Sequence, residues 1–324
     1  MKRKIDELPL PAVLLAICLT LSGCIYSNSK NSAPTSTDPK SSGTLSYTSK
    51  DYAKPKVIAR LQDESIRESS GIVASRRNKG IFWTHNDSGD DPFLYAFDRE
   101  GKKRGVWKVA GAKNVDWEDI AAFTDKNGES FLFIGDIGNN ERDRRELVIY
   151  RVREPEISAA DAESNKKNPI LTENAEAIRV SYPDAQHNAE TLLVHPQTGD
   201  LYVLSKTSES DAGIYKLPAP YTGKTQTLEH LGSIAVPSIT RGLLTAGEIS
   251  PDGKRVILCD YFAAYEFVLP EGAKSFDVIW KETASSIDAD KREQGEAVCY
   301  GSDGRSIFAT SEKKNPPLIE IRRK

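Results

Sequence analysis

Short apolar runs of roughly four to seven residues, separated by turns that contain glycine, follow one another along most of the chain. Runs of this length that are rich in Val, Ile, Tyr and Phe predict β-strands. The runs come in groups of four. In each group a glutamate precedes the first strand, a turn leads to a second strand that ends in polar residues, and a third and a more loosely written fourth strand follow. The pattern predicts an all-β domain built from a repeated four-stranded unit.

The repeat occurs five times, and the glutamates that open its copies are Glu68, Glu118, Glu190, Glu248 and Glu296. Four-stranded propeller blades take about 40 to 50 residues each, which is close to the spacing of most of these glutamates. The longest interval contains the polar segment 155–174, which we expect to form a loop insertion. The repeat therefore predicts a β-propeller of five four-stranded blades within residues 55–324. A ring of six blades is the alternative, although the sequence contains no sixth glutamate-strand unit.

The two ends of this region complement each other. Fourth strands are expected at 105–109, 177–182, 230–236 and 277–280, but the last unit reaches Lys324 without one. Residues 56–62 form an apolar run that precedes the first glutamate and can supply the missing strand. An N-terminal strand that completes the last blade closes the ring and leaves no long open sheet edge.

The N-terminal residues have the composition of a targeting segment. Three basic residues at 2–4 precede an apolar run over 8–21, which is too short to cross a bilayer of roughly 30 Å as a helix. The run ends in Leu-Ser-Gly-Cys, which resembles a bacterial lipobox and implies cleavage before Cys24 and lipidation of that cysteine. An ordinary signal peptide is the alternative.

Three segments follow from this: a lipoprotein signal peptide at 1–23, a lipidated cysteine and flexible tether at 24–54, and a single propeller domain at 55–324. The lipid would hold the protein on a membrane of the cell envelope. Because Ile25 rather than an aspartate follows the cysteine, similarity to sorted lipoproteins implies the periplasmic side of the outer membrane if the source is Gram-negative.

The repeated glutamates should meet at one end of the propeller axis. In an antiparallel hairpin the start of the first strand lies beside the end of the second, and the first strands of a propeller line its axis. Beside the five glutamates we therefore expect the residues at the ends of the second strands and in the adjoining loops, which are His85, Asn86, Asp87, Asp116, Asp136, Lys206, Asp260 and Glu312. Carboxylates held this close either take up protons or are neutralised by cations. The candidate counter-charges are Lys206, Arg241 and Arg67.

Two roles remain open for the glutamates. Each can accept hydrogen bonds from the backbone of a neighbouring blade, or the oxygen-rich mouth can bind a hard cation such as Ca²⁺. Loops 85–91 and 135–141 are rich in Asp, Asn and Gly, a composition suited to cations and polar ligands. Trp117 stands among acids at 114–119, where it can stack on a ligand ring or wedge between blades.

Three motifs carry a family resemblance. His-Asn-Asp-Ser-Gly at 85–89, Asp-Trp-Glu-Asp at 116–119 and Gly-Asp-Ile-Gly-Asn at 135–139 resemble those of bacterial lipoprotein β-propellers of largely unassigned role, over roughly residues 55–324. More distantly, the axial acids resemble those of phytase-like and lactonase-type propellers, which are calcium-dependent hydrolases. The resemblance implies an acid and amide ligand set for Ca²⁺ at Glu68, Asn86, Asp87, Asp136 and Asp260.

Other candidate chemistry is sparse. His85 is the one histidine expected at the mouth, either as a general base or as a structural side chain. No Gly-x-Ser-x-Gly nucleophile motif occurs. After removal of the signal and use of Cys24 as an anchor, Cys259 and Cys299 remain. Export permits a disulfide between them, and two buried free thiols are the alternative.

Charge and composition narrow the function further. The sequence has 44 Lys and Arg against 47 Asp and Glu, so its net charge of −3 argues against a general nucleic-acid binder. The leading hypothesis is a lipid-anchored extracytoplasmic propeller that binds a small polar ligand, a cation or an envelope protein at its acidic axial mouth. The alternatives are a Ca²⁺-dependent hydrolase of a phosphoester or lactone, with His85 or an axial glutamate as base, and a scaffold for an envelope complex.

Overall fold

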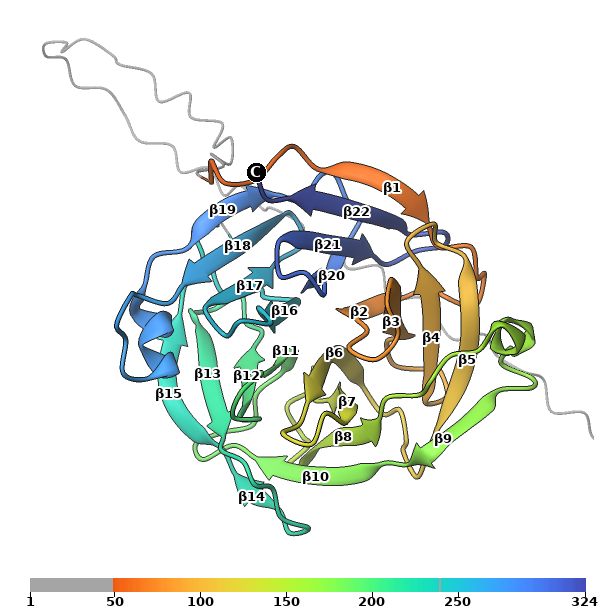
Figure 1. Ribbon diagram of the computed structural model, residues 1–324. Coiled ribbons are helices and arrows are strands. Elements are labelled where there is room, and N and C mark those ends of the chain that lie inside the picture. The colour runs from red at the N-terminus through yellow and green to blue at the C-terminus, as the bar shows by residue number, and fades with distance from the viewer. Residues whose placement is uncertain (1–48, 239) are drawn as a thin grey trace, which may run out of the picture. The chain divides into compact units, whose positions relative to one another are not determined.

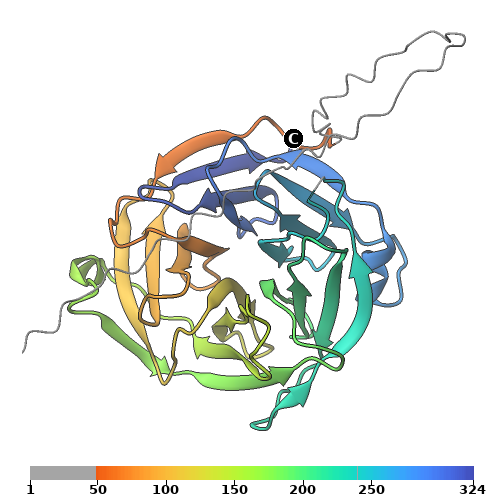
Figure 2. The same ribbon diagram turned by 180° about the vertical axis from the view of Figure 1, so that it is seen from behind.

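The computed structural model describes residues 49–238 and 240–324, which form five β-sheets arranged as blades around a central axis (Figure 1). The first strand of every blade lies next to the axis, and neighbouring first strands contact one another around the ring. The view from behind shows the same closed circle of sheets (Figure 2). The prediction of an all-β propeller is confirmed, with five blades rather than six.

The blades are numbered from the first repeat, and each is given from the axis outward. Blade 1 contains β2 (Ser69–Ala74), β3 (Ile81–Asn86), β4 (Phe93–Asp98), β5 (Lys103–Ala110) and β9 (Ile170–Asn174). Blade 2 contains β6 (Trp117–Thr124), β7 (Ser130–Asp136), β8 (Leu147–Arg153), β10 (Glu176–Ser181) and β14 (Gln226–Thr227). Blade 3 contains β11 (Ala189–Val194), β12 (Leu201–Ser205), β13 (Ala212–Leu217) and β15 (Glu229–Ile234). Blade 4 contains β16 (Ala246–Ile249), β17 (Arg255–Cys259), β18 (Ala263–Val268) and β19 (Ser285–Asp288). Blade 5 contains β20 (Gly295–Tyr300), β21 (Ser306–Ser311), β22 (Pro317–Arg322) and β1 (Lys56–Arg60).

The N-terminal strand closes the ring as predicted, because β1 pairs antiparallel with β22 as the outermost strand of blade 5. Contacts with the domain extend upstream of this strand. Tyr52 forms a β-bridge with Arg323, and the Ala53 N–H donates to the Arg322 carbonyl at 2.8 Å. The predicted signal peptide, the lipidated Cys24 and residues 25–48 lie outside the described residues.

Two local expectations were wrong. Segment 155–174 is not a plain loop, because it contains the 3₁₀ helix η1 (Ala159–Glu163) and strand β9, which pairs parallel with β5. Residues 277–280 lie in the 3₁₀ helix η2 (Phe276–Lys281), and the outer strand of blade 4 is β19. The Ser275 side chain accepts from the Asp277 N–H and starts η2, which then buries Ile279 and Trp280. An apolar run this short fits either structure. Among the described residues, no helix has both the length and the apolar surface needed to cross a membrane.

The hydrophobic core consists of clusters between neighbouring blades. Every residue of the first strands β2 and β11 is buried, whereas the outer strand β10 alternates between exposed and buried positions. Trp117 is fully buried between blades 1 and 2, and its Nε1 donates to the Lys113 carbonyl at 2.9 Å. Trp117 is thus the wedge between blades rather than a stacking surface for a ligand.

The two cysteines of the domain are buried free thiols, so the disulfide alternative is wrong. Cys259 lies in the cluster between blades 4 and 5, and Cys299 lies in the cluster between blades 5 and 1. Their side chains belong to different interblade cores.

Candidate functional site: an acidic mouth on the propeller axis

A β-bulge sets the level of three of the repeated glutamates. In blades 1, 2, 3 and 5 the register between the first and second strands shifts at the same place, and a bulged residue leaves the hydrogen-bonded ladder with its side chain re-aimed. The residues at these shifts are Ser70, Glu118, Glu190 and Glu296. Three glutamates therefore share one level near the mouth of the channel.

The other two predicted members of the ring lie elsewhere. Glu68 stands two residues before the bulge of blade 1 and is exposed. Blade 4 has no bulge, and Glu248 pairs with Ile257 in an unbroken ladder, deeper along the channel. The five repeated glutamates consequently do not form one ring.

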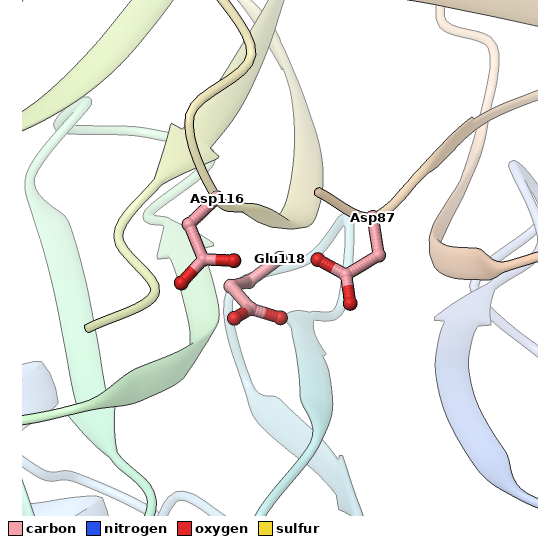
Figure 3. Close-up of side chains that lie close together, drawn as sticks. All are labelled: Asp87, Asp116 and Glu118. Carbon is pink, nitrogen blue, oxygen red and sulfur yellow. The ribbon is translucent and has the colours of Figure 1, made fainter. Parts of the chain in front are cut away.

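Asp87, Asp116 and Glu118 form a compact acidic triad at the mouth (Figure 3). Asp87 directly follows β3, Asp116 directly precedes β6, and Glu118 is the bulged residue of β6. One carboxylate oxygen from each lies within 4.8 Å of the others. Asp87 and Asp116 are half-buried, whereas Glu118 is only 4% exposed. Within the described chain, the Glu118 carboxylate accepts no hydrogen bond and forms no ion pair.

Gly138 makes room for this triad. A Cβ at Gly138 would lie 2.3 Å from Oδ2 of Asp116 and 2.3 Å from Oε1 of Glu118, closer than any real contact. The Gly138 N–H also donates to the Asp116 carbonyl at 3.1 Å, which holds the loop after β7 against the two side chains. A residue without a side chain lets the backbone approach the carboxylates this closely.

The triad belongs to a larger group of six carboxylates, which we call the acidic mouth: Asp87, Asp116, Glu118, Glu190, Glu296 and Glu312. Burial and the charge of Asp87 raise the pKa of Asp116 to about 6. Burial, together with the charges of its acidic neighbours, raises the pKa of Glu118 well above its usual value. Burial and Glu190 raise the pKa of Glu296 to about 8. These raised pKa values mean that full ionisation of the six carboxylates is unfavourable when no bound cation neutralises them.

Lys206, one of the three candidate counter-charges, lies at the mouth. Its Nζ forms an ion pair with Glu190 and lies 4.8 Å from the centre of the Tyr261 ring. Burial lowers the pKa of Lys206, but attraction from Glu190 and Glu296 outweighs this and holds the pKa above its usual value. One lysine does not balance six carboxylates.

Three residues of the implied calcium ligand set already accept hydrogen bonds from protein donors. Asp136 accepts from Arg144 at 2.8 Å and from the Asp116 N–H at 3.0 Å. The Asn86 side-chain oxygen accepts from two backbone N–H groups, at 3.0 and 3.1 Å.

Asp260 accepts hydrogen bonds through both of its carboxylate oxygens. It accepts from the Phe262 and Ala263 N–H groups at 2.8 and 2.9 Å and from the Tyr265 hydroxyl at 2.8 Å. Of the four tentative metal ligands Asn86, Asp87, Asp136 and Asp260, only Asp87 belongs to the triad.

His85 and Arg241 do not serve the mouth. His85 is fully buried, with Nδ1 3.0 Å from the Asn86 carbonyl and its ring edge-on to Trp117, and burial lowers its pKa to about 4. The Arg241 side chain is 63% exposed and pairs with Asp211. The third candidate counter-charge, Arg67, is exposed and donates to a backbone carbonyl.

Below the mouth, two buried carboxylates accept hydrogen bonds from other blades and so link blades around the channel. Oδ2 of Asp119 accepts from the Leu192 N–H of blade 3 at 3.0 Å and from the Gly247 N–H of blade 4 at 3.3 Å. Glu248 accepts from the Tyr300 N–H of blade 5 at 2.6 Å. The structural role considered for the glutamates therefore applies to Glu248, and Asp119 shares it, but Glu118 has no such partner.

Sequence reasoning missed Gly138 and Asp119, although both stand inside the motifs at 135–139 and 116–119. The glycine was a readable signal, since a glycine in a loop beside several acids indicates a close approach of backbone to a site. Nothing in the sequence distinguishes Asp119, which binds neighbouring strands, from Glu118, which does not.

The comparisons with known proteins assign neither a family nor an activity. No family model matches the sequence, and no curated protein matches it. Among solved structures the chain is similar to a gluconolactonase from Xanthomonas campestris, with 10% identity and a TM-score of 0.44, over 88% of this chain and 99% of that one. A likeness at this level carries no inference about activity. The family resemblance of the three motifs stays a prediction.

Proposed function

We propose that the acidic mouth binds a divalent cation, with Ca²⁺ preferred, and through this cation holds a small polar ligand or an envelope protein. The observation that supports this is the buried Glu118 carboxylate, which lies between Asp87 and Asp116 without a partner of its own. Ca²⁺ takes six to eight oxygen ligands in flexible geometry, and the triad offers only oxygen atoms. Carboxylates of the larger mouth and solvent can complete such a coordination shell.

A purely structural role explains Glu118 poorly. Burial and the charges of Asp87 and Asp116 disfavour an ionised Glu118 carboxylate, and the described residues donate no hydrogen bond to it. Gly138 fits the same interpretation, because its missing side chain keeps the triad together rather than separating its charges. A bound cation would turn each of these costs into an attraction.

Calcium titration of the EDTA-treated protein tests the proposal. We expect calorimetry to detect Ca²⁺ binding and expect Ca²⁺ to raise the melting temperature. Glu118→Gln should weaken binding at least about tenfold, a loss of about 1.4 kcal/mol. Glu248→Gln is the matched control, since Glu248 is also 4% exposed but lies away from the triad, and it should keep the wild-type affinity. Absence of binding heat and of any melting shift up to about 10 mM Ca²⁺ would refute the proposal.

We favour binding over hydrolysis. A Ca²⁺-dependent hydrolase of a phosphoester or lactone needs a general base within reach of the substrate. The candidate bases are His85, which is fully buried in blade 1, and an axial glutamate such as Glu118, which is almost fully buried and lies among other acids. Activity towards generic phosphoester or lactone substrates that EDTA abolishes would reverse this preference.

We further propose that the chain is exported and anchored through lipidated Cys24, on the periplasmic side of the outer membrane in a Gram-negative cell. The lipobox-like sequence supports this. Residues 49–54 join the propeller at the face opposite the mouth, where the Tyr52 hydroxyl donates to Glu266 at 2.6 Å. Metabolic labelling with an alkyne fatty acid should mark the wild type and not Cys24→Ser.

A further inference from the structure

A polar pocket of about 600 Å³ lies on blade 3, at the same face as the acidic mouth. It meets the mouth at Lys206, whose ion pair with Glu190 forms the boundary between the two. Pockets that bind small molecules measure roughly 300 to 1,000 Å³. The blade-3 pocket is therefore large enough for a ligand of its own.

A hydrogen-bonded trio lines this pocket. Nε2 of His187 lies 3.1 Å from Oδ1 of Asp184 and 2.9 Å from the hydroxyl of Tyr215. That hydroxyl donates to Oδ2 of Asp184 at 3.1 Å. The His187 ring is also packed edge-on against Tyr182, with centroids 4.9 Å apart. The imidazole is thus fixed on two sides.

This network assigns the tautomer of His187. An ionised carboxylate only accepts hydrogen bonds, so the Nε2 atom facing Asp184 carries the proton. Nδ1 of the neutral ring then has a lone pair and, among the described residues, no hydrogen-bond donor. His187 is 29% exposed and lines the pocket, so Nδ1 is an acceptor available to a ligand.

The charges of the pocket balance. Arg142 lies opposite Glu209 at 3.9 Å, and Arg241 pairs with Asp211. Lys206 and Asp184 complete a lining of three cations and three carboxylates. A ligand with net charge would gain attraction from one half of this lining and repulsion from the other, whereas a hydroxyl both donates and accepts and can satisfy either.

The two rim arginines also adopt an unfavourable backbone. Arg142 has φ of 54° and Arg241 has φ of 46°, a region that residues with side chains seldom occupy. Such conformations are concentrated at functional sites, where the surroundings hold them in place. Both arginines line the blade-3 pocket.

We propose that the blade-3 pocket binds a neutral polyhydroxylated molecule, a saccharide or polyol, with one hydroxyl donating to Nδ1 of His187 and others bridging the arginine–carboxylate pairs of the rim. This binding does not require a cation at the acidic mouth. It is therefore separable from the proposed function.

Saturation-transfer NMR with glucose, N-acetylglucosamine and xylitol, each at about 20 mM in EDTA, tests this inference. We expect transfer to at least one of the three probes. His187→Gln keeps a donor for Asp184 but lacks an acceptor at the Nδ1 position, and it should reduce the transfer at least fivefold. Arg241→Ala should do the same.

The matched control is Arg179→Ala. Arg179 lies on the outer strand β10, away from the pocket, and forms an exposed ion pair with Glu146. This variant should behave as the wild type. No transfer to any of the three probes would overturn the proposal, as would transfer that survives both pocket substitutions. Preferential binding of citrate over the neutral probes would overturn it as well. Because EDTA is present throughout, the result is independent of calcium.

Discussion

The two ends of the propeller channel treat buried carboxylates differently. On the face opposite the mouth, Glu154, which follows the third strand of blade 2, accepts from Trp83 Nε1 at 2.8 Å and from the Arg76 and Arg77 N–H groups at 3.2 Å. Glu248 accepts from Arg76 at 2.7 Å and from a backbone N–H of blade 5. Each of these buried acids is surrounded by donors.

At the mouth, Glu118 is buried to the same degree as Glu248 but is surrounded by other acids. Donated hydrogen bonds stabilise an ionised carboxylate, and among the described residues Glu248 receives them and Glu118 does not. The comparison teaches that burial alone does not separate structural from functional acids. What separates Glu118 from Glu248 is the set of partners that the protein supplies.

The largest expected effect is on stability at the far end. Glu248→Ala should lower the free energy of unfolding by about 3 kcal/mol at pH 8, because it removes the acceptor of both the Arg76 guanidinium and the Tyr300 N–H. Glu118→Gln should leave the calcium-free protein unchanged or stabilise it, since it removes a repelled charge. Denaturant titration in EDTA compares the two. Equal losses for both variants would mean that Glu118 has a structural partner and would remove the contrast.

The sequence predicted the propeller but not the difference between Glu118 and Glu248. The repeat, the turns and the complementary ends predicted the five blades and their closure, because strand periodicity and unit length are local properties of the chain. A bulge is not. Glu118 and Glu248 occupy the same position of the sequence repeat. Blade 2 has an extra, bulged residue and blade 4 does not, so the two side chains lie at different depths along the channel.

The blade-3 pocket was hidden for a related reason. Its trio joins Asp184 and His187, from the segment before β11, to Tyr215 on the third strand of blade 3. A histidine expected in a loop gives no sign of a partner 28 positions away. The strand pairing that brings them together is specified by the whole blade rather than by any short motif.

A smaller effect should follow from changing the shape of the mouth without changing its charge. Gly138→Ala places a methyl group where Asp116 and Glu118 now lie, so it should push the carboxylates apart and weaken Ca²⁺ binding about tenfold. Gly223→Ala is the matched control, because a Cβ there meets nothing within 4 Å. Calorimetry on both variants measures the difference. If Gly138→Ala binds Ca²⁺ like Gly223→Ala, then the triad is not the site.

The smallest expected effect is a fall in melting temperature with rising pH. Calcium should remove the part of this fall that comes from the mouth and leave the part that comes from the far end. In the calcium-free protein the pKa of Asp116 is raised to about 6 and that of Glu296 to about 8, in both cases first by burial. Carboxyls in the unfolded chain titrate near pH 4, so the stability associated with the protonated forms is complete below pH 4 and is lost as pH rises through 6 and then 8. The melting temperature in EDTA should therefore fall by about 2 to 4 °C between pH 5 and pH 8 on account of the mouth.

Calcium provides the control for this last effect. Burial also raises the pKa of Glu248, to about 7, against the pull of Arg76, so part of the fall in EDTA originates at the far end. Ca²⁺ requires ionised ligands and binds more tightly as the mouth loses protons, so it should remove only the mouth's share of the fall. Differential scanning calorimetry at both pH values, with EDTA and with Ca²⁺, separates the shares. In Glu118→Gln, Ca²⁺ should no longer reduce the fall in melting temperature, whereas in Glu248→Gln it still should. An identical pH dependence with and without Ca²⁺ would contradict the difference between the two ends.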